Sequence, residues 1–230
     1  VSVWADEVRR PGSAYMSAAT QALQRDDTQN PAFLWVRDGE QRFAAQCAGC
    51  HAAADMRGVA ARYPAIDART GQALTLAGRI RSCHERHLRR SAPGWESEPL
   101  LALLAFVTLP SRGMPIAPPA DARLDAVRAA GEALWRQPFG QLGLACAQCH
   151  DRLPGQRLAG STIPQAHPTG YPIYRLEWQG LGTLQRRMRG CLTAVRAEPF
   201  DEGSAAWVAL EAMLMRRAAG MPLDAPGVRP

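Results

Sequence analysis

The sequence predicts an all-α protein made of two tandem modules from an internal duplication, with an N-terminal extension before them. Apolar residues recur at helical spacing, and almost no stretch shows the alternation typical of a strand. An internal repeat occurs in the same block order in both halves. The 230 residues suit two modules of roughly 100 residues better than one.

Four matched blocks make up the repeat. They pair Gly39-Glu40 with Gly131-Glu132, Cys47 with Cys146, residues 78–83 with 186–191, and residues 112–116 with 219–223. Their order predicts an extension over residues 1–36, a first module over 37–116 and a second module over 121–223. Residues 115–119, rich in proline, form the predicted linker between the modules.

Each predicted helix has local support. A short helix is expected at residues 17–25 of the extension, and Asp121 is expected to cap a helix in the second module. Closing helices are expected at residues 97–109 and 204–217, each starting at a serine that can cap. A further helix follows from five residues at spacings of three and four: Leu181, Leu184, Met188, Cys191 and Val195.

Two C-x-x-C-H motifs, Cys47 to His51 and Cys146 to His150, carry the chemistry. Each is a haem attachment signature: two thiols form thioether bonds to one porphyrin, and the adjacent histidine becomes the proximal iron ligand. The predicted attachment residues are Cys47, Cys50, Cys146 and Cys149, and the predicted proximal ligands are His51 and His150. Two such motifs in similar surroundings predict two covalently bound haem c groups, and hence two cytochrome c-like domains.

Composition excludes some partners and favours others. The formal charge is +6 and the pI about 9.4, but the basic excess is arginine with no RNA- or DNA-binding motif, so no nucleic-acid partner is expected. Acidic proteins or small anions are better candidates. The longest apolar run, residues 100–109, is too short to span a membrane. Haem attachment implies export, so we expect a periplasmic protein that starts at Val1 as a processed form does.

The distal iron ligands follow from position. Cys83 and Cys191 each stand after their own haem motif and before their own closing helix, which favours one cysteine per haem. Met114 and Met221 follow the closing helices, so we expect them to pack against the neighbouring module instead. The alternatives are a Cys83–Cys191 disulfide, two inert buried thiols, or ligation by His84. A thiolate ligand stabilises ferric iron, so both haems are expected to have low potentials.

Two arginines repeat the same relation to these cysteines. Arg187 stands four residues before Cys191, and Arg79 four residues before Cys83, so each lies one helical turn from its thiol. A guanidinium there can stabilise a thiolate or hold a small oxyanion close to the sulfur. The alternative is an ion pair between Arg187 and a haem propionate. Spacing does not distinguish the two sites.

Across nearly the whole chain, these features resemble the A subunits of the SoxAX cytochrome complexes of bacterial thiosulfate oxidation. The resemblance also includes residues 23–27, 30–31, 34–35 and 111–115. It implies a small mono-haem partner cytochrome and a carrier protein with a cysteine on a mobile C-terminal arm (SoxY-like). It also implies coupling of thiosulfate to that cysteine, giving a cysteine S-thiosulfonate and two electrons. In this family the second haem is the active site, so Cys191 and Arg187 are the implied catalytic residues, and Cys83 is the distal ligand of the first haem.

Rival functions make different predictions. A thiosulfate dehydrogenase would join two thiosulfates into tetrathionate without a carrier protein, but that family normally has methionine where this chain has Cys191. A plain di-haem electron carrier would show methionine ligation and a raised potential. A di-haem peroxidase is disfavoured because no spare histidine occupies equivalent places in the two modules.

Overall fold

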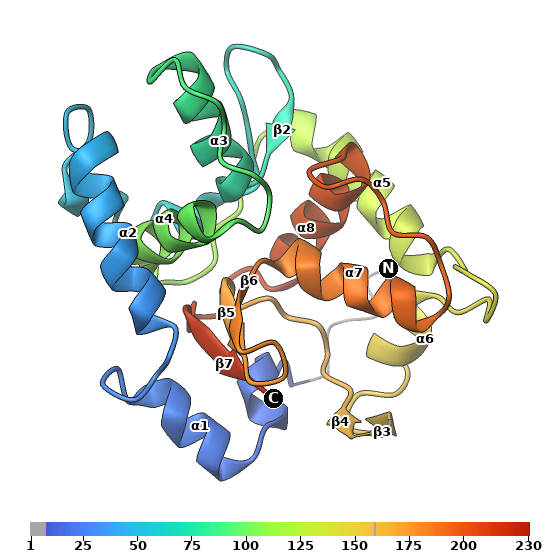
Figure 1. Ribbon diagram of the computed structural model, residues 1–230. Coiled ribbons are helices and arrows are strands. Elements are labelled where there is room, and N and C mark those ends of the chain that lie inside the picture. Colours follow the sequence, from blue (N-terminus) through green and yellow to red (C-terminus); the bar gives the residue numbers. More distant parts are fainter. Residues whose placement is uncertain (1–7, 159) are drawn as a thin grey trace.

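The computed structural model describes residues 8–158 and 160–230, so the first seven residues of the predicted extension lie outside the described part. The described chain is mainly helical, and its two halves lie side by side (Figure 1). The helices are η1 Gly12–Tyr15, α1 Ala18–Arg25, α2 Phe33–Gln46, η2 Ala53–Met56, η3 Ala60–Arg62, α3 Leu76–Arg86, α4 Glu98–Thr108, η4 Leu109–Ser111, α5 Arg123–Arg136, α6 Cys146–His150, α7 Leu184–Ala194 and α8 Ala205–Arg217.

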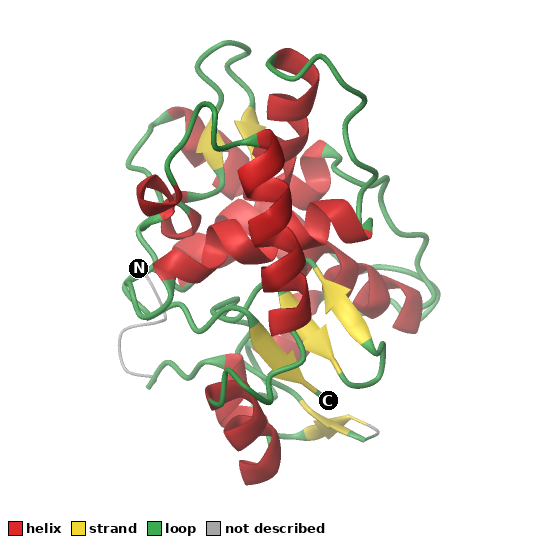
Figure 2. Ribbon diagram, turned by 60° about the vertical axis from the view of Figure 1, so that its left-hand side comes forward, coloured by secondary structure: helices red, strands yellow, loops and turns green. Residues whose placement is uncertain are grey.

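Short strands accompany these helices (Figure 2). They are β1 Ala65–Ile66, β2 Ala73–Leu74, β3 Arg157–Leu158, β4 Ser161–Thr162, β5 Ile173–Arg175, β6 Gly180–Gly182 and β7 Gly227–Arg229. β5 lies at the centre of a three-stranded sheet, antiparallel to β6 and parallel to β7. The expectation of little strand agrees with this structure, whose strands have only two or three residues each, too short to show alternation in the sequence.

Both halves follow the same order of elements. In the first half α2, a haem motif, the β1–β2 hairpin, α3 and α4 follow one another; in the second half α5, a haem motif, the β5–β6 hairpin, α7 and α8 do so. The hairpins share one register, because Ala65 pairs with Leu74 as Ile173 pairs with Gly182, 108 residues further on (173 − 65 = 182 − 74 = 108). α2 begins at Phe33, four residues ahead of the predicted first module.

A glycine allows close contact between the two long helices of each half. α2 packs on α4, and α5 on α8. A Cβ on Gly39 would lie 2.0 Å from the carbonyl oxygen of Ala102, and one on Gly131 would lie 2.2 Å from that of Ala209. Any side chain at either position would collide with the backbone of the partner helix. This explains the matched Gly-Glu blocks of the repeat.

The two halves are joined through their matched Gly-Met-Pro segments. Ile116 donates its backbone N–H to the carbonyl oxygen of Met221 at 2.9 Å, and Leu223 donates to that of Met114 at 2.9 Å. Met221 is buried in the core of the first half with Leu100 and Ile116, as expected. Met114 differs from the expectation, because its side chain lies beside Gly58 of its own half.

Several predicted helix starts need correction. Ala122, not Asp121, occupies the N-cap of α5, while Asp121 accepts the N–H of Arg123 from one position further out. Ser97 and Ser204 stand at the N-caps of α4 and α8, but neither side chain makes the capping hydrogen bond. Ser17 does cap α1, by accepting from Thr20.

The helix predicted from Leu181 to Val195 starts later. Leu181 lies in β6, and Thr183 caps α7 by accepting the N–H of Arg186. A threonine N-cap ends the strand and begins the helix within two residues, and the periodicity of apolar residues continues across this boundary. Thr75 caps α3 in the same way by accepting from Gly78.

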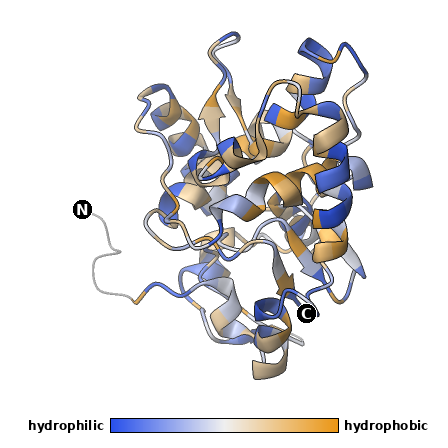
Figure 3. Ribbon diagram, turned by 90° about the vertical axis from the view of Figure 1, so that its left-hand side faces the viewer, coloured by the Kyte–Doolittle hydropathy of each residue, from blue (hydrophilic) through white to orange (hydrophobic). Residues whose placement is uncertain are grey.

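The buried apolar residues form three clusters, and Figure 3 shows hydrophobic segments in the middle of the molecule. α4 and α8 supply a large share of these residues, with Leu100, Leu103, Trp207 and Leu210 at most 3% exposed. Among the described residues, no helix combines the length and the apolarity that crossing a bilayer requires. The N-terminal extension lies against the second half, where Arg9 donates to the carbonyl oxygen of Ala219 at 2.8 Å.

Two half-buried carboxyl groups, of Glu96 and Glu211, lie where the halves meet, and Glu211 lines a small cavity of about 60 Å³ there. Glu96 accepts hydrogen bonds from the N–H and hydroxyl of Thr183, and burial raises its pKa. Burial also raises the pKa of Glu211 to about 7, and the nearby charge of Glu96 acts in the same direction, against a hydrogen bond from Gln185. Neither carboxylate has an arginine ion pair among the described residues.

We expect Glu211 to make stability depend on pH. Its folded-state pKa is raised from 4.5 to about 7, so the native protein binds this proton more tightly than the unfolded chain does. The resulting stabilisation is complete below about pH 4.5 and is lost as pH rises towards about 7, with a size of up to about 3 kcal/mol. Urea unfolding of wild type and Glu211→Gln between pH 4.5 and 8 tests this. An equal pH slope in the two proteins would contradict it.

Candidate functional site: a cavity beside the second C-x-x-C-H motif

The second motif forms the short helix α6, and its histidine is held in one orientation. Nδ1 of His150 lies 2.7 Å from the carbonyl oxygen of Pro164. This contact makes Nδ1 the protonated nitrogen and leaves Nε2 with its lone pair free for a metal. Burial lowers the pKa of His150, and the charges of Arg187 and Arg217 lower it further, while the Pro164 contact opposes them. The imidazole is therefore neutral, as an iron ligand must be.

A cavity of about 420 Å³ opens beside this histidine. Its size falls in the range of small-molecule and cofactor sites. The walls are largely apolar and aromatic, and they include Trp135, Phe139, Met188, Leu192, Trp207 and Leu210. Cys146, His150, Arg187 and Cys191 also line it, so the structure brings together every residue predicted for the second site except Cys149, which lies in the same short helix.

Cys191 lies close to the cysteines of the C-x-x-C-H motif in its own half. Burial raises the pKa of the Cys146 thiol to about 11, and the next largest contributions include the neighbouring thiols of Cys191 and Cys149. All six cysteines lie in the described part of the chain, and each is a free thiol. The alternative of a Cys83–Cys191 disulfide is thus not what the structure contains, because each of these cysteines lies near its own motif.

The first half repeats the grouping with less enclosure. Burial raises the pKa of Cys47, and the neighbouring thiols of Cys83 and Cys50 add to this effect. The motif forms a turn after α2 rather than a helix, and Cys50 and His51 are exposed. His84, the rival ligand, is buried, and its Nε2 has no hydrogen-bond partner within the described residues.

The two arginines that spacing alone could not distinguish have different partners. Arg79 donates to Asp67 at 2.8 Å and to the hydroxyl of Tyr63 at 3.3 Å, and Arg86 pairs with the same Asp67 at 2.7 Å. Arg187 lines the cavity and forms no ion pair within residues 8–158 and 160–230. A charged guanidinium with no carboxylate partner in the described residues leaves the second site able to accept an anion, whereas Asp67 already occupies the matching arginine of the first half.

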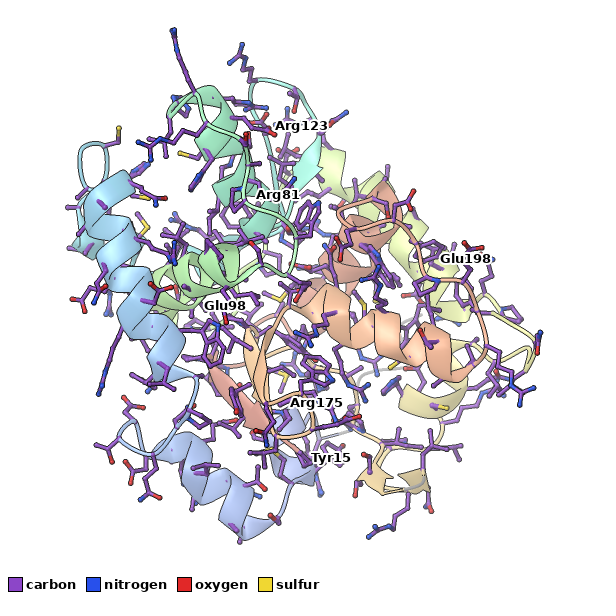
Figure 4. The ribbon with its side chains drawn as sticks, viewed as in Figure 1. Tyr15, Arg81, Glu98, Arg123, Arg175 and Glu198 are labelled. Atoms are coloured by element: carbon purple, nitrogen blue, oxygen red, sulfur yellow. The ribbon has the colours of Figure 1, made fainter. Side chains whose placement is uncertain are left out.

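Sequence reasoning missed several residues of the cavity wall. Tyr171 and Arg175 come from the β5 segment, His167 from the loop before it, and Tyr15 from the N-terminal extension. Figure 4 labels Tyr15 and Arg175, which approach the same cavity from different elements. A signal for the β5 residues was present, because Tyr63-Pro64 recurs as Tyr171-Pro172 at the hairpin offset of 108 residues. Nothing in the sequence pointed to the contribution of the extension.

Hydrogen bonds and an ion pair of the neighbouring Asp151 hold the surroundings of His150 in place. Asp151, next to the motif, accepts the indole N–H of Trp135 at 2.9 Å and pairs with Arg217 at 2.6 Å. The rings of Trp135 and His150 lie 5.5 Å apart between centroids. α5, α6 and α8 are thereby held together around the histidine, which is the rigid support that a metal ligand needs.

A haem attachment motif, an oriented histidine and an apolar cavity on a helical framework define a c-type cytochrome. The model of the SoxA/TsdA cytochrome c domain matches the chain at residues 33–116 and again at 130–223. A cytochrome c domain carries covalently bound haem c, and the residues of the second cavity fit that group.

Comparison with known proteins places the chain more narrowly. It is 32% identical to the L-cysteine S-thiosulfotransferase subunit SoxA of Rhodovulum sulfidophilum, over 97% of this chain and 81% of that protein. It is 30% identical to the subunit of the same name from Paracoccus pantotrophus, over 95% and 78%. The crystal structure of SoxXA from P. pantotrophus superimposes with a TM-score of 0.92 at 29% identity, over 96% of this chain and 87% of that one. The chain belongs to the SoxA family.

Proposed function

We propose that the protein is the di-haem A subunit of an L-cysteine S-thiosulfotransferase, which couples thiosulfate oxidatively to a cysteine of a carrier protein. The main structural support is the cavity beside the second haem motif, which Cys191 and Arg187 both line. Arg187 has no ion-pair partner among the described residues. The names of the relatives support this function, since they match over almost the whole chain. The organisation that goes with it is a duplicated pair of cytochrome c domains, at residues 37–116 and 121–223, behind an extension at 1–36.

The proposed cofactors are two covalently bound haem c groups. Cys47 and Cys50 would attach the first, with His51 and Cys83 as its iron ligands. The second would be attached through Cys146 and Cys149, with His150 and Cys191 as iron ligands. When bound, the haem iron accepts electrons one at a time and passes them on. The free Nε2 of His150, the apolar walls and the closeness of Cys191 to Cys146 support this assignment for the second half.

The coupling reaction needs an environment that lets two anions approach each other. A sulfur–sulfur bond forms between the carrier thiolate and the outer sulfur of thiosulfate, the thiol proton is released, and two electrons leave. Arg187 offsets the charge of thiosulfate at the cavity, so that the thiolate can come within bonding distance. The sulfur of Cys191 lies next to the thiosulfate site. It would take part either by leaving the iron during the reaction or by carrying a sulfane sulfur. The aromatic walls keep water out of the cavity, which strengthens the attraction between Arg187 and the thiosulfate anion.

The proposed partners follow from the same reaction. A small mono-haem cytochrome, SoxX-like, would receive the electrons one at a time and pass each to an external acceptor; the superimposed crystal structure is named for a SoxXA complex. A SoxY-like carrier would present its cysteine on a mobile arm to the cavity mouth. Haem attachment of this kind is made after export, so we place the protein in the periplasm.

An activity assay separates this function from its rivals. We expect the holoprotein, with its mono-haem partner, to convert carrier protein and thiosulfate to the carrier's cysteine S-thiosulfonate, detected by intact-protein mass spectrometry, with an electron acceptor reduced by two electrons per adduct. Thiosulfate alone should yield little tetrathionate. Rapid tetrathionate formation without carrier would establish the thiosulfate dehydrogenase instead, and no product in either assay would leave a plain electron carrier.

A further inference from the structure

One position of the hairpin has opposite charge in the two halves. The constant offset of 108 residues aligns Tyr63 with Tyr171, Thr75 with Thr183 and Arg79 with Arg187. The same offset aligns Asp67 with Arg175 (175 − 67 = 187 − 79 = 108). Both stand at the end of the first strand of their hairpin, Asp67 directly after β1 and Arg175 as the last residue of β5.

In the first half this position neutralises the arginine next to the cysteine. Asp67 is buried and accepts from Arg79 at 2.8 Å and from Arg86 at 2.7 Å. An anion from solution would have to displace a buried carboxylate that already pairs with two guanidinium groups. The first half therefore carries its own anion at the place where a substrate anion would bind.

In the second half the same position adds a positive charge. Arg175 is 8% exposed and lines the cavity together with Arg187, and the charge of Arg187 is, after burial, the largest effect that lowers the pKa of Arg175. One terminal nitrogen of Arg175 donates to the exposed Glu177 at 2.7 Å, while its Nε is buried with no hydrogen-bond partner within the described residues. Arg187 is half-buried, so two positive charges, one of them buried, line one cavity and favour an anion bound between them.

A haem propionate is the competing counter-ion, and the first half argues against it. That half has its own haem motif, yet Asp67, an acidic residue that would repel a propionate, occupies the matched position. The position is therefore not one that a propionate requires. The requirement for positive charge belongs to the second half alone, where the proposed chemistry takes place.

We propose that Arg175 is a second binding residue for the substrate anion, which together with Arg187 holds the oxygen-bearing end of thiosulfate, and that Asp67 closes the first half to such anions. This rests on the proposed function. Two guanidinium groups offer paired donors to the sulfonate oxygens. The outer sulfur is then left free to point towards Cys191 and the incoming carrier thiolate.

Arg175→Gln and Arg175→Lys test this in the holoprotein with its mono-haem partner. We expect Arg175→Gln to raise both the KM for thiosulfate and its equilibrium Kd, measured by calorimetry without carrier, at least about tenfold, with a smaller change in kcat. Arg175→Lys retains the charge but loses the paired donors, so its KM and Kd should lie between those of wild type and Arg175→Gln. Arg189→Gln is the matched control, since Arg189 pairs with Glu202 at the surface and should leave both constants unchanged.

Glu177→Gln is a second test variant. It should fold normally, because the side chain of Glu177 is 68% exposed. Removing its charge frees Arg175 for the ligand and should lower the thiosulfate Kd about twofold to fivefold. Unchanged Kd values in Arg175→Gln and Glu177→Gln would overturn the proposal. So would a shift in the EPR spectrum or midpoint potential of the second haem without a change in Kd, which would assign Arg175 to a propionate. Absence of the thiosulfonate product with wild type would instead refute the proposed function.

Discussion

Replacing Cys191 by methionine is expected to abolish thiosulfate coupling, by at least about 100-fold in kcat/KM, while both haems remain attached. The thioether of methionine neither carries a negative charge nor accepts a sulfane sulfur, so the sulfur chemistry proposed for Cys191 has no substitute. Methionine ligation should also raise the midpoint potential of that haem. Haem content follows from the pyridine haemochrome spectrum, and coupling from the mass of the carrier protein.

Cys83→Met is the matched control, because Cys83 holds the equivalent place in the first half. There Arg79 is already paired with Asp67, so the site offers no free charge to an incoming anion. We expect this variant to show the same change in EPR signature at its own haem but to retain most of its coupling activity. Normal turnover by Cys191→Met, or equal losses in the two variants, would contradict the role proposed for Cys191.

The C-x-x-C-H motifs and the matched glycines could be recognised in the sequence because covalent haem attachment and close helix contact each demand particular residues. Attachment needs two cysteines and a histidine at fixed spacing, and the contact between α5 and α8 needs a glycine at one position. Such requirements leave a sequence signature that survives divergence of everything around them. The closing helices were found for a similar reason, since an apolar stretch of about eleven residues is long enough to show its boundaries.

What the sequence did not predict depends on contacts between distant segments. β7 comes from the end of the chain and pairs with β5, more than fifty residues earlier (227 − 173 = 54). The extension reaches the same region, where Gln24 accepts the backbone N–H of Val228 at 3.0 Å. Short strands of this kind depend on pairing with a strand that is distant in the sequence, so no local sequence pattern predicts them.

The spacing of residues in the sequence also could not show that the two cysteine sites differ in charge. Arg79 and Arg187 stand at identical distances from their cysteines, and only their partners differ. The decisive residue, Asp67 in one half and Arg175 in the other, lies twelve positions away in a hairpin whose two-residue and three-residue strands escaped notice. Under the proposal made for Arg175 and Asp67, a single reversal of charge between two halves with the same order of elements would separate a substrate site from a closed one.

Replacing Gly131 by alanine is expected to destabilise the protein by about 2 kcal/mol or more, although alanine is the better helix former. The added Cβ would lie 2.2 Å from the carbonyl oxygen of Ala209 and 2.9 Å from Cβ of Met213, so α5 and α8 must move apart. Separation loses packing around Trp135 and Trp207, which line the cavity of the second site. Urea unfolding of the holoprotein, followed by circular dichroism, measures the effect.

Gly190→Ala supplies the control, because Gly190 also lies within a helix but has only the end of the Arg187 side chain, at 3.8 Å, near its Cβ position. There the higher helix propensity of alanine acts alone, and we expect a gain of up to about 1 kcal/mol. Gly39→Ala should reproduce the loss in the first half, where the corresponding carbonyl oxygen of Ala102 lies 2.0 Å away. If Gly131→Ala and Gly190→Ala changed stability alike, close helix contact would not be the reason for the matched glycines. Opposite signs at the two positions would tie these glycines to the helix crossing that supports each haem motif.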